Sequence, residues 1–395
     1  YFVTTNVTDG YKKWNGLADP EGDIEVATAP ADGSGTLLGT WFGRAVMAGN
    51  KDFPYRVYIS DPLDAETWTG GTTTSVDLTY DGEEGGITAI FPELQGRLYI
   101  ATSRSIYELS ATDPADVSTY LLKRISKGVG CVSQSTVVAT PNDVLFCSQR
   151  GLHSLRKVVV SDQAETTFLS RDVQKLFTDL INPLLWDQAK ALWDEKENLY
   201  VLTVASAGQT TNDTVLAYNI NFDLWLKWTD IDARSFGEYV LTGRSYILKG
   251  GETGKISYLD NTKTTDLGEG FAASFKSGKF FPEGEIAHER EFVSVTALIT
   301  ARNPSNIQIG WSIDSIDKTK TGFKTATIGQ DADLLGSSFV LGTSQLGRGR
   351  YLPVRVSVGQ KGYNFQLDIT ASGDSDIEFH GWILEVSQDE NTKYS

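Results

Sequence analysis

The feature that most constrains this chain is a unit of four short strand-like runs, clearest between residues 85 and 126. Small, apolar β-branched and aromatic residues alternate there with polar ones, and Gly, Ser, Asp and Pro lie between the runs. Period-two alternation bounded by turn residues is typical of antiparallel β-strands. The pattern predicts strands at 87–92, 97–102, 105–109 and 119–125. One such sheet leaves a face uncovered, so it needs similar sheets beside it.

Comparable units recur along the chain. Their first strands are predicted to begin near Trp41, Ile87, Val132, Ala189 and Ser235. A repeat of about 40–50 residues with four strands per unit is the pattern of a β-propeller. The longer step before Ala189 has a visible cause, since Arg171–Asn182 has the pattern of a short inserted helix.

Two further parts of the chain complete the predicted propeller. Residues 1–28 have the pattern of two or three strands of another blade, which gives six blades with room for a seventh. Helical periodicity is confined to 171–182 and 186–193. Because the chain begins with Tyr1 rather than Met, we expect that an N-terminal segment precedes it.

The spacing of the units changes near residue 265, and a second region follows. Apolar residues alternate cleanly there, as at Ile307, Ile309 and Ile313 and at Phe365, Leu367 and Ile369. Several strands of this kind predict a β-sandwich of the jelly-roll type. The sequence therefore predicts an all-β chain with a propeller at 1–265 and a sandwich at 266–390.

The charge of the chain limits its function. The formal net charge is −16 and the pI is about 4.7, which disfavours binding to a nucleic-acid backbone as the main role. No apolar run is long enough to predict a membrane-spanning helix, and no secretory signal is visible. The two cysteines, Cys131 and Cys147, are predicted to be free buried thiols, because Cys147 is expected to face Thr136 across a hairpin and Cys131 to lie too far away for a disulfide.

Few residue patterns indicate chemistry, and we predict no catalytic, cofactor-binding or metal-binding residue. Ser60 to Trp68 resembles the Asp-box hairpin of sialidase-like propellers, in which an Asp side chain supports a tight turn. We interpret Asp61 and Asp64 as structural. His153 is expected to be packed in a strand, His288 to be exposed, and His380 to lie in a late strand, without metal-ligand spacing.

Three further patterns have a functional and an ordinary interpretation. Residues 250–256 superficially resemble a phosphate-binding loop, but Lys249 and Ile256 replace its Gly and Ser/Thr, so a turn is predicted. The acidic pairs Asp331/Asp333 and Asp374/Asp376 suit Ca²⁺, although solvated loops explain them as well. The basic run Arg348, Arg350 and Arg355 suits an acidic partner, or is ordinary surface charge.

Several phrases together resemble a known family. They are GTWFGRAVMAG (39–49), YRVYISDPLDAETW (55–68), GGITAIFPELQGRLYIATSRSIYEL (85–109), KGVGCVSQSTVVATPNDVLFCSQRGLHSL (127–155) and NINFDLWLKW (219–228). They resemble β-propeller structural proteins of tailed bacteriophages, of the head-to-tail stabilisation and tail-nozzle kind, over roughly residues 36–260. The resemblance implies a virion protein of the tail without enzyme activity or cofactor. It implies a homo-oligomeric ring, commonly a hexamer, that contacts the portal, adaptor or other tail proteins.

That resemblance sets an expectation about charge. In such a ring, genomic DNA passes through the channel without specific binding, and an acidic wall repels phosphate. We therefore expect the acidic excess on the channel side and basic residues, including Arg348, Arg350 and Arg355, at contacts between copies. Two alternatives stay open: a receptor-binding or sialidase-like propeller that binds glycans, and a propeller scaffold for peptides or proteins unrelated to viruses.

Overall fold

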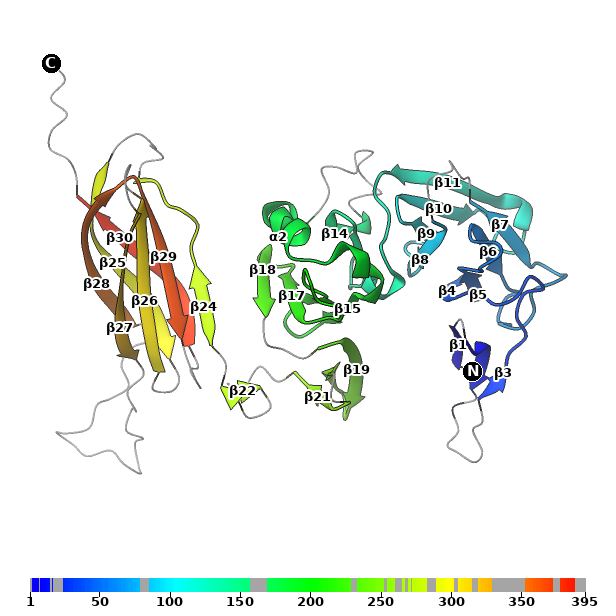
Figure 1. Ribbon diagram of the computed structural model, residues 1–395. Helices are drawn as coiled ribbons and strands as arrows, with labels where there is room; N and C mark the ends of the chain where they lie inside the picture. Colours follow the sequence, from blue (N-terminus) through cyan, green and yellow to red (C-terminus); the bar gives the residue numbers. More distant parts are fainter. Residues whose placement is uncertain are drawn as a thin grey trace, which may run out of the picture. The chain divides into compact units, whose positions relative to one another are not determined.

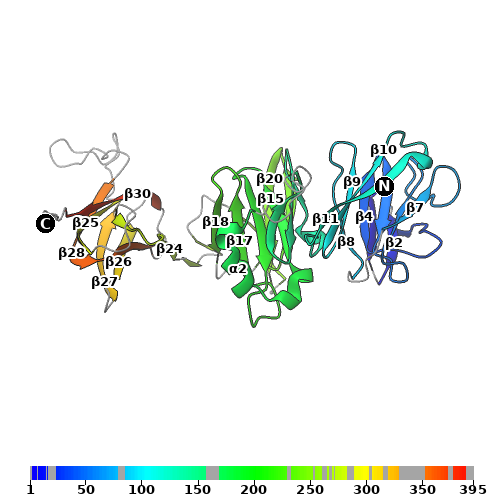
Figure 2. The ribbon, with the colours of Figure 1, turned by 90° about the horizontal axis from the view of Figure 1, so that it is seen from above.

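The protein is all-β and consists of many small antiparallel sheets (Figures 1 and 2). The computed structural model describes residues 2–6, 8–14, 16, 24–78, 85–156, 169–228, 233–251, 254–259, 265–266, 269–270, 272–282, 289–301, 305–314, 319–328, 352–371 and 377–387. The chain divides into two compact units, Tyr1–Leu259 and Asp260–Ser395, close to the expected boundary at residue 265. We call them the N-terminal and C-terminal units.

The described part of the N-terminal unit contains six sheets, each formed by consecutive strands. The first two are β1 (Phe2–Asn6), β2 (Gly10–Trp14) and β3 (Glu25–Val26), and β4 (Leu37–Trp41), β5 (Arg44–Ala48), β6 (Arg56–Ile59) and β7 (Thr74–Asp77). The third is β8 (Ile87–Ile90), β9 (Leu98–Thr102), β10 (Ser105–Ala111) and β11 (Tyr120–Lys127). The strands predicted at 87–92, 97–102, 105–109 and 119–125 are therefore confirmed, and the two or three strands predicted before residue 28 are found as β1, β2 and β3.

The last three of these sheets follow the same plan. They are β12 (Val138–Ala139), β13 (Val144–Ser148) and β14 (Gly151–Ser154); β15 (Lys190–Asp194), β16 (Leu199–Val204), β17 (Thr214–Asn219) and β18 (Leu224–Trp228); and β19 (Ser235–Leu241), β20 (Arg244–Gly250) and β21 (Ile256–Tyr258). In the sheet of β12–β14, Leu169 N–H donates to the Leu152 carbonyl at 2.8 Å, at the position expected for a fourth strand. Residues 157–168 lie outside the described part.

The insertion before β15 is helical, as predicted, but shorter. It contains a 3₁₀ turn at Arg171–Val173, α2 at Gln174–Asp179 and a second 3₁₀ segment at Pro183–Gln188. Asn182 accepts a hydrogen bond from Leu184 N–H, and Pro183 occupies the first turn, where its missing N–H costs nothing. The helical prediction for 186–193 is wrong beyond Gln188, because β15 pairs along its whole length with β16.

Neighbouring sheets of the N-terminal unit pack face to face. Five apolar cores lie between them, one for each pair of sheets that follow one another in sequence. The first strands of successive sheets contact each other in the pairs β1–β4, β4–β8, β12–β15 and β15–β19. Trp41 illustrates such a junction: it is fully buried, donates from Nε1 to the Gly96 carbonyl at 3.2 Å, and contacts the Tyr120 ring edge-on.

The described part of the C-terminal unit contains two sheets around one core, and a short hairpin of β22 (Thr265–Asp266) and β23 (Glu269–Gly270). The strands of the two sheets are β24 (Ala273–Lys276), β25 (Arg290–Ala301), β26 (Ser305–Asp314), β27 (Thr319–Ile328), β28 (Leu352–Gly362), β29 (Asn364–Ala371) and β30 (Ile377–Val386). The strand orders are β24-β29-β26-β27 and β28-β25-β30.

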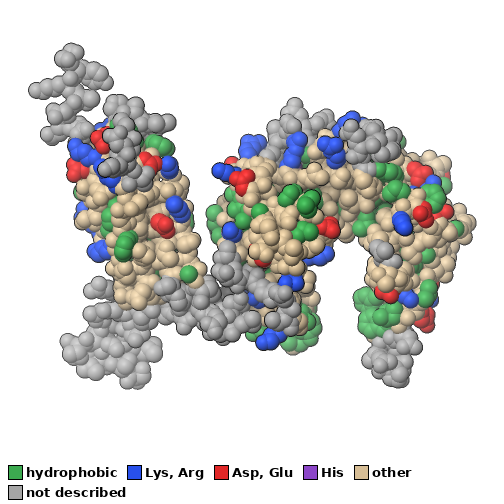
Figure 3. Space-filling view, in the orientation of Figure 1, with side chains coloured by type: hydrophobic (Ala, Val, Ile, Leu, Met, Phe, Trp, Pro, Cys, Tyr) green, Lys and Arg blue, Asp and Glu red, His purple; other side chains and the backbone are tan. Residues whose placement is uncertain are grey.

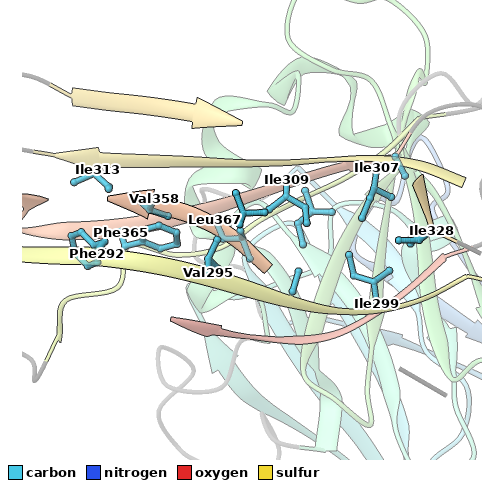
Figure 4. Packing of buried hydrophobic residues seen from close by; sticks show 14 residues of the cluster. Phe292, Val295, Ile299, Ile307, Ile309, Ile313, Ile328, Val358, Phe365 and Leu367 are labelled. Atoms are coloured by element: carbon cyan, nitrogen blue, oxygen red, sulfur yellow. The ribbon is translucent and has the colours of Figure 1, made fainter. Parts of the chain in front are cut away.

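Both sheets of the C-terminal unit contribute to that core. Phe292, Val295 and Ile299 of one sheet pack against alternate residues of the other (Figure 4). The predicted alternation is confirmed, since Ile307, Ile309, Ile313, Phe365, Leu367 and Ile369 are all buried. The side chains between them therefore point to the outer face of the four-stranded sheet.

Candidate functional site

The Asp-box-like turn has a structural role. The Asp64 carboxylate accepts hydrogen bonds from Glu66 N–H at 2.9 Å and from the Thr67 hydroxyl at 2.9 Å, and these bonds hold its pKa below the usual range. Asp61 accepts the Thr72 hydroxyl at 2.7 Å. Both carboxylates therefore stabilise local backbone, as the sequence predicts.

The same turn joins the first two sheets. Lys13 of β2 forms an ion pair with Glu66 at 3.0 Å, and Glu66 also accepts Thr28 N–H at 3.0 Å. The Tyr11 hydroxyl donates to the Ala65 carbonyl at 2.9 Å. These contacts use the polar groups of the turn to connect the sheets, so they explain its residues without a ligand.

Two of the three histidines lie in the described part. His153 is buried, its Nε2 lies 2.8 Å from the Ser148 hydroxyl, and its ring stacks on Phe146. Burial, with a smaller contribution from the Arg150 charge, lowers the pKa of His153 to about 4. His380 Nε2 lies 2.6 Å from the Thr300 hydroxyl in β25. The packed role predicted for His153 is confirmed, and His288 lies outside the described residues.

The cysteines are free and buried, as predicted. The reason given for Cys131 is wrong, because Val132 N–H donates to the Cys147 carbonyl at 2.9 Å and so brings the two segments together. Thr136 lies between them and contacts both Cys131 Sγ and Cys147 N–H. Burial raises the pKa of Cys131 to about 11 and that of Cys147 to about 12, so both thiols stay protonated.

The remaining predicted patterns are only partly described. Gly250 ends β20 and Ile256 begins the antiparallel β21, as expected for a connection between two strands, and residues 252–253 lie outside the described part. Arg355 pairs with Glu385, and its Nε donates to the Ser294 hydroxyl at 3.0 Å, so its charge is already neutralised within the C-terminal unit. The pairs Asp331/Asp333 and Asp374/Asp376, and Arg348 and Arg350, lie outside the described residues. Where the chain is described, no group of three His, Cys, Asp or Glu side chains is placed to hold a metal ion.

Sequence reasoning missed a buried arginine. Arg44 of β5 is 1% exposed, and its guanidinium donates to the carbonyls of Ser60, Thr72 and Pro114 at 2.8–3.0 Å and to the Thr72 hydroxyl. Carbonyl oxygens thus surround a buried positive charge, and Pro114 lies in the connection between β10 and β11 of the next sheet. A charged residue inside the otherwise apolar run 44–48 was the only signal in the sequence.

The first and last sheets of the N-terminal unit each carry apolar side chains on the outer face, which on the first sheet alternate with Thr4 and Lys12. We call these two faces the end faces. The register places Phe2 and Trp14 side by side on one, with ring centroids 5.5 Å apart and Val26 exposed beside them. The other end face contains Tyr239, Leu241, Tyr246, Leu248, Ile256 and Tyr258. Ile256 is 73% exposed and Tyr258 53%. Figure 3 shows hydrophobic side chains gathered over both sheets.

The outer face of the four-stranded sheet in the C-terminal unit is hollowed. The hollow has a volume of about 280 Å³ and is lined by Lys276, Gln308, Gly310, Trp311, Ser312, Thr321, Gly322, Phe323, Asp368 and Thr370. Four strands contribute to it, and most of the side chains are polar.

Comparison with known proteins gives no family for this chain. No protein-family model matches it, and no curated protein matches it. Among solved structures, a protein titled "Glycoside hydrolase" is similar at a TM-score of 0.25 and 10% identity, over 91% of this chain and 98% of that one. A Bacillus thuringiensis Cry1Da tryptic core variant is similar at a TM-score of 0.17 and 9% identity, over 74% and 50% of the two chains. Similarity this low carries no argument about fold or activity. No described helix has the length and hydropathy needed to cross a membrane.

Proposed function

We propose that this protein is a structural component of a bacteriophage tail, a ring-forming, non-catalytic part of the head-to-tail connector or nozzle. Its N-terminal unit is a six-bladed β-propeller, and its C-terminal unit is a β-sandwich. The sequence phrases quoted above motivate the phage assignment. The packing of the sheets and the exposed apolar side chains support the propeller and its assembly.

The propeller is supported by how the six sheets pack. Each sheet covers the next face to face, and the first strand of a sheet lies against the first strand of its neighbour. Blades of a propeller pack in this way around a central channel. The two end faces supply the remaining junction, because the outer faces of β1–β3 and β19–β21 both carry exposed aromatic and aliphatic side chains.

The observation that carries the ring is an exposed apolar hairpin, at the turn between β17 and β18. Phe222 is 78% exposed at this turn, and Leu224 and Ile220 beside it are 50% and 37% exposed. Clustered apolar residues at a surface mark contacts with other proteins. Since β15 contacts the neighbouring sheets and β18 is the strand farthest from it, the hairpin lies at the outer rim of the row of sheets. If a second copy binds this hairpin, and each further copy binds the next in the same way, the copies close into a ring.

The net charge agrees with a DNA conduit. DNA carries about one negative charge per 1.7 Å of its axis, so a basic channel would bind it and slow its ejection. This chain has 51 acidic and 35 basic residues, so its net charge is negative, like that of DNA. We expect acidic side chains on the channel side of the assembled ring, where repulsion reaches about 8 Å at physiological salt.

Electron microscopy and mass photometry of the purified protein test the ring. We expect the wild-type chain to form rings with an open, acidic channel, and Phe222→Asp combined with Leu224→Asp to give monomers. Leu63→Asp is the matched control, since Leu63 is an exposed apolar residue in another turn. A wild-type protein that stays monomeric at micromolar concentration, or a ring lined mainly by Lys and Arg, contradicts the proposal. Hydrolysis of sialosides or phosphodiesters that a single acidic substitution abolishes would instead favour an enzyme.

A further inference from the structure

Gly310 lies in the interior of β26, where a glycine is unfavourable. Glycine in a strand interior costs roughly 0.5–1 kcal/mol relative to alanine and marks a bulge, a bend or the close approach of another group. The register of β26 with both neighbours is continuous at Gly310, and its φ is not in the left-handed region. A Cβ placed there would lie 3.5 Å from the Asp368 carbonyl oxygen, which is an ordinary contact.

Neither the backbone nor the packing of the protein therefore requires a glycine at this position. The contrast with Gly322 is direct: a Cβ at Gly322 would come within 2.3 Å of the Trp311 ring, so packing explains that glycine. Because Gly310 has no side chain, the outer face of the sheet is bare at this position, which is the floor of the hollow.

The register aligns four residues in a row across the floor of this hollow. Lys276 of β24 is opposite Asp368 of β29, Asp368 is opposite Gly310, and Gly310 is opposite Phe323 of β27. The Phe323 ring is 66% exposed, although it lies in the middle of its strand. A cation and a carboxylate therefore lie at one end of the row, a bare floor in the middle, and an aromatic ring at the other end.

Several polar side chains of the hollow are not used within the described part of the protein, although the Ser312 hydroxyl donates to Gln366 Oε1 at 3.5 Å. Among described residues, the side chains of Lys276, Asp368 and Thr370 make no hydrogen bond or ion pair. Elsewhere on the same sheet polar groups are paired: Lys279 with Asp314, and Gln366 Nε2 with the Ser277 carbonyl at 2.7 Å. The hollow thus combines available donors and acceptors with an exposed ring.

We propose that this hollow is a saccharide-binding site. A sugar hydroxyl both donates and accepts, so Asp368 can accept from one hydroxyl while Lys276 donates to its neighbour, and Gln308 and Thr370 can do either. The apolar C–H face of a pyranose can pack on an aromatic ring. The exposed Phe323 ring offers such a surface, which a bound sugar would cover. A ring over Gly310 would reach both ends of the row.

Other ligand classes fit this geometry less well. An added peptide strand binds along a sheet edge, whereas the hollow lies on a sheet face. A phosphate or other anion would meet the Asp368 carboxylate, and a divalent cation would find a single carboxylate beside an ammonium group. A neutral, hydroxyl-rich ligand satisfies both charged side chains at once.

An array of bacterial surface oligosaccharides, probed with the full chain, tests the proposal, and titration calorimetry follows with the oligosaccharide that binds best. We expect Phe323→Ala to weaken binding by up to about tenfold, since an aromatic contact contributes about 0.5–1.5 kcal/mol. Gly310→Leu should abolish binding while the melting temperature stays equal or rises, because a side chain there fills open space. Ile383→Ala is the matched control, since Ile383 is 60% exposed on the other sheet.

Two outcomes overturn the saccharide site: an array without signal above background, or a bound oligosaccharide whose affinity is the same for Phe323→Ala and Gly310→Leu. Ring formation is a separate measurement on the same variants. A failure of this proposal therefore leaves the proposed tail role standing, and a monomeric protein that binds sugar leaves the site standing.

Discussion

Arg44 Nη2 donates a 2.8 Å hydrogen bond to the carbonyl of Pro114, which lies in the connection between β10 and β11 of the next sheet. The buried charge thus links two sheets through backbone oxygen atoms. Because this guanidinium makes four hydrogen bonds, its full desolvation is offset only while all its acceptors stay in place. Its position fixes the spacing of the second and third sheets.

Replacing Arg44 should therefore destabilise the N-terminal unit strongly. Arg44→Met removes donors from the carbonyls of Ser60 and Thr72, while the Pro114 carbonyl keeps the Tyr120 hydroxyl. We expect a loss of about 2–5 kcal/mol in the free energy of unfolding, because each buried acceptor that loses its donor costs about 1–3 kcal/mol. Urea denaturation followed by tryptophan fluorescence measures it. Arg171→Met, at an exposed position, should cost less than about 0.5 kcal/mol. Equal midpoints for the two variants would show that Arg44 does not join the sheets.

His153 should make stability depend on pH. Its pKa is about 4 in the folded protein and about 6.5 when unfolded, so the unfolded chain binds the extra proton between these values. Stability from this residue is complete above pH 6.5 and is lost as the pH falls to 4, by about 3 kcal/mol in total.

A comparison with His153→Phe isolates this contribution from that of the carboxylates. The difference in unfolding free energy between wild type and variant should change by about 3 kcal/mol between pH 7 and pH 4. A constant difference would mean that His153 titrates normally in the folded state. Leu121→Ala serves as control, because Leu121 is 64% exposed and has no titratable group.

The two thiols should be unreactive in the folded protein. Cys131 and Cys147 are fully buried and protonated at neutral pH, and the thiolate is the reactive form. We expect no reaction with a thiol reagent under native conditions and two equivalents in denaturant. Leu121→Cys places a thiol at a position that is 64% exposed and should add one fast-reacting equivalent. Fast labelling of the wild-type protein would show that the core opens readily.

Strand positions were readable from the sequence because local patterns determine them. The alternation around Ile307 and Phe365 and the turns beside 87–127 depend on residues a few positions apart, and they identified the strands correctly. The helical pattern at 186–193 misled because pairing of β15 with β16 overrides local preference. The repeat of about 40–50 residues predicted small sheets packed against one another, and the N-terminal unit contains such sheets.

The candidate sites were not readable, because they depend on register between distant strands. Gly310 and Phe323 become neighbours only through the pairing of β26 with β27, and Asp368 joins them from β29. Neither Phe323 nor Lys276 belongs to a recognisable pattern. Arg44 likewise meets Pro114 only when two sheets pack. Single-sequence reasoning detects periodicity, whereas these contacts depend on tertiary structure.

The end faces give the sharpest test of the propeller. If the outer faces of β1–β3 and β19–β21 cover each other within one chain, Trp14→Ala and Tyr258→Ala each remove a packed ring. We expect each variant to lose about 2–4 kcal/mol of unfolding free energy. Side chains in contact are also coupled, so the double variant should depart from additivity by about 0.5–3 kcal/mol.

Chemical denaturation of the four proteins in this mutant cycle measures the coupling, and a cycle of Tyr258→Ala with Leu121→Ala is the control. Leu121 is exposed on β11, in the third sheet, so its substitution should add to Tyr258→Ala without coupling. The coupling between Trp14 and Tyr258 should not change with protein concentration, because closure within one chain is unimolecular. A coupling that grows with concentration would mean that the end faces join separate copies, and single-variant losses below about 0.5 kcal/mol would mean that both faces stay in solvent.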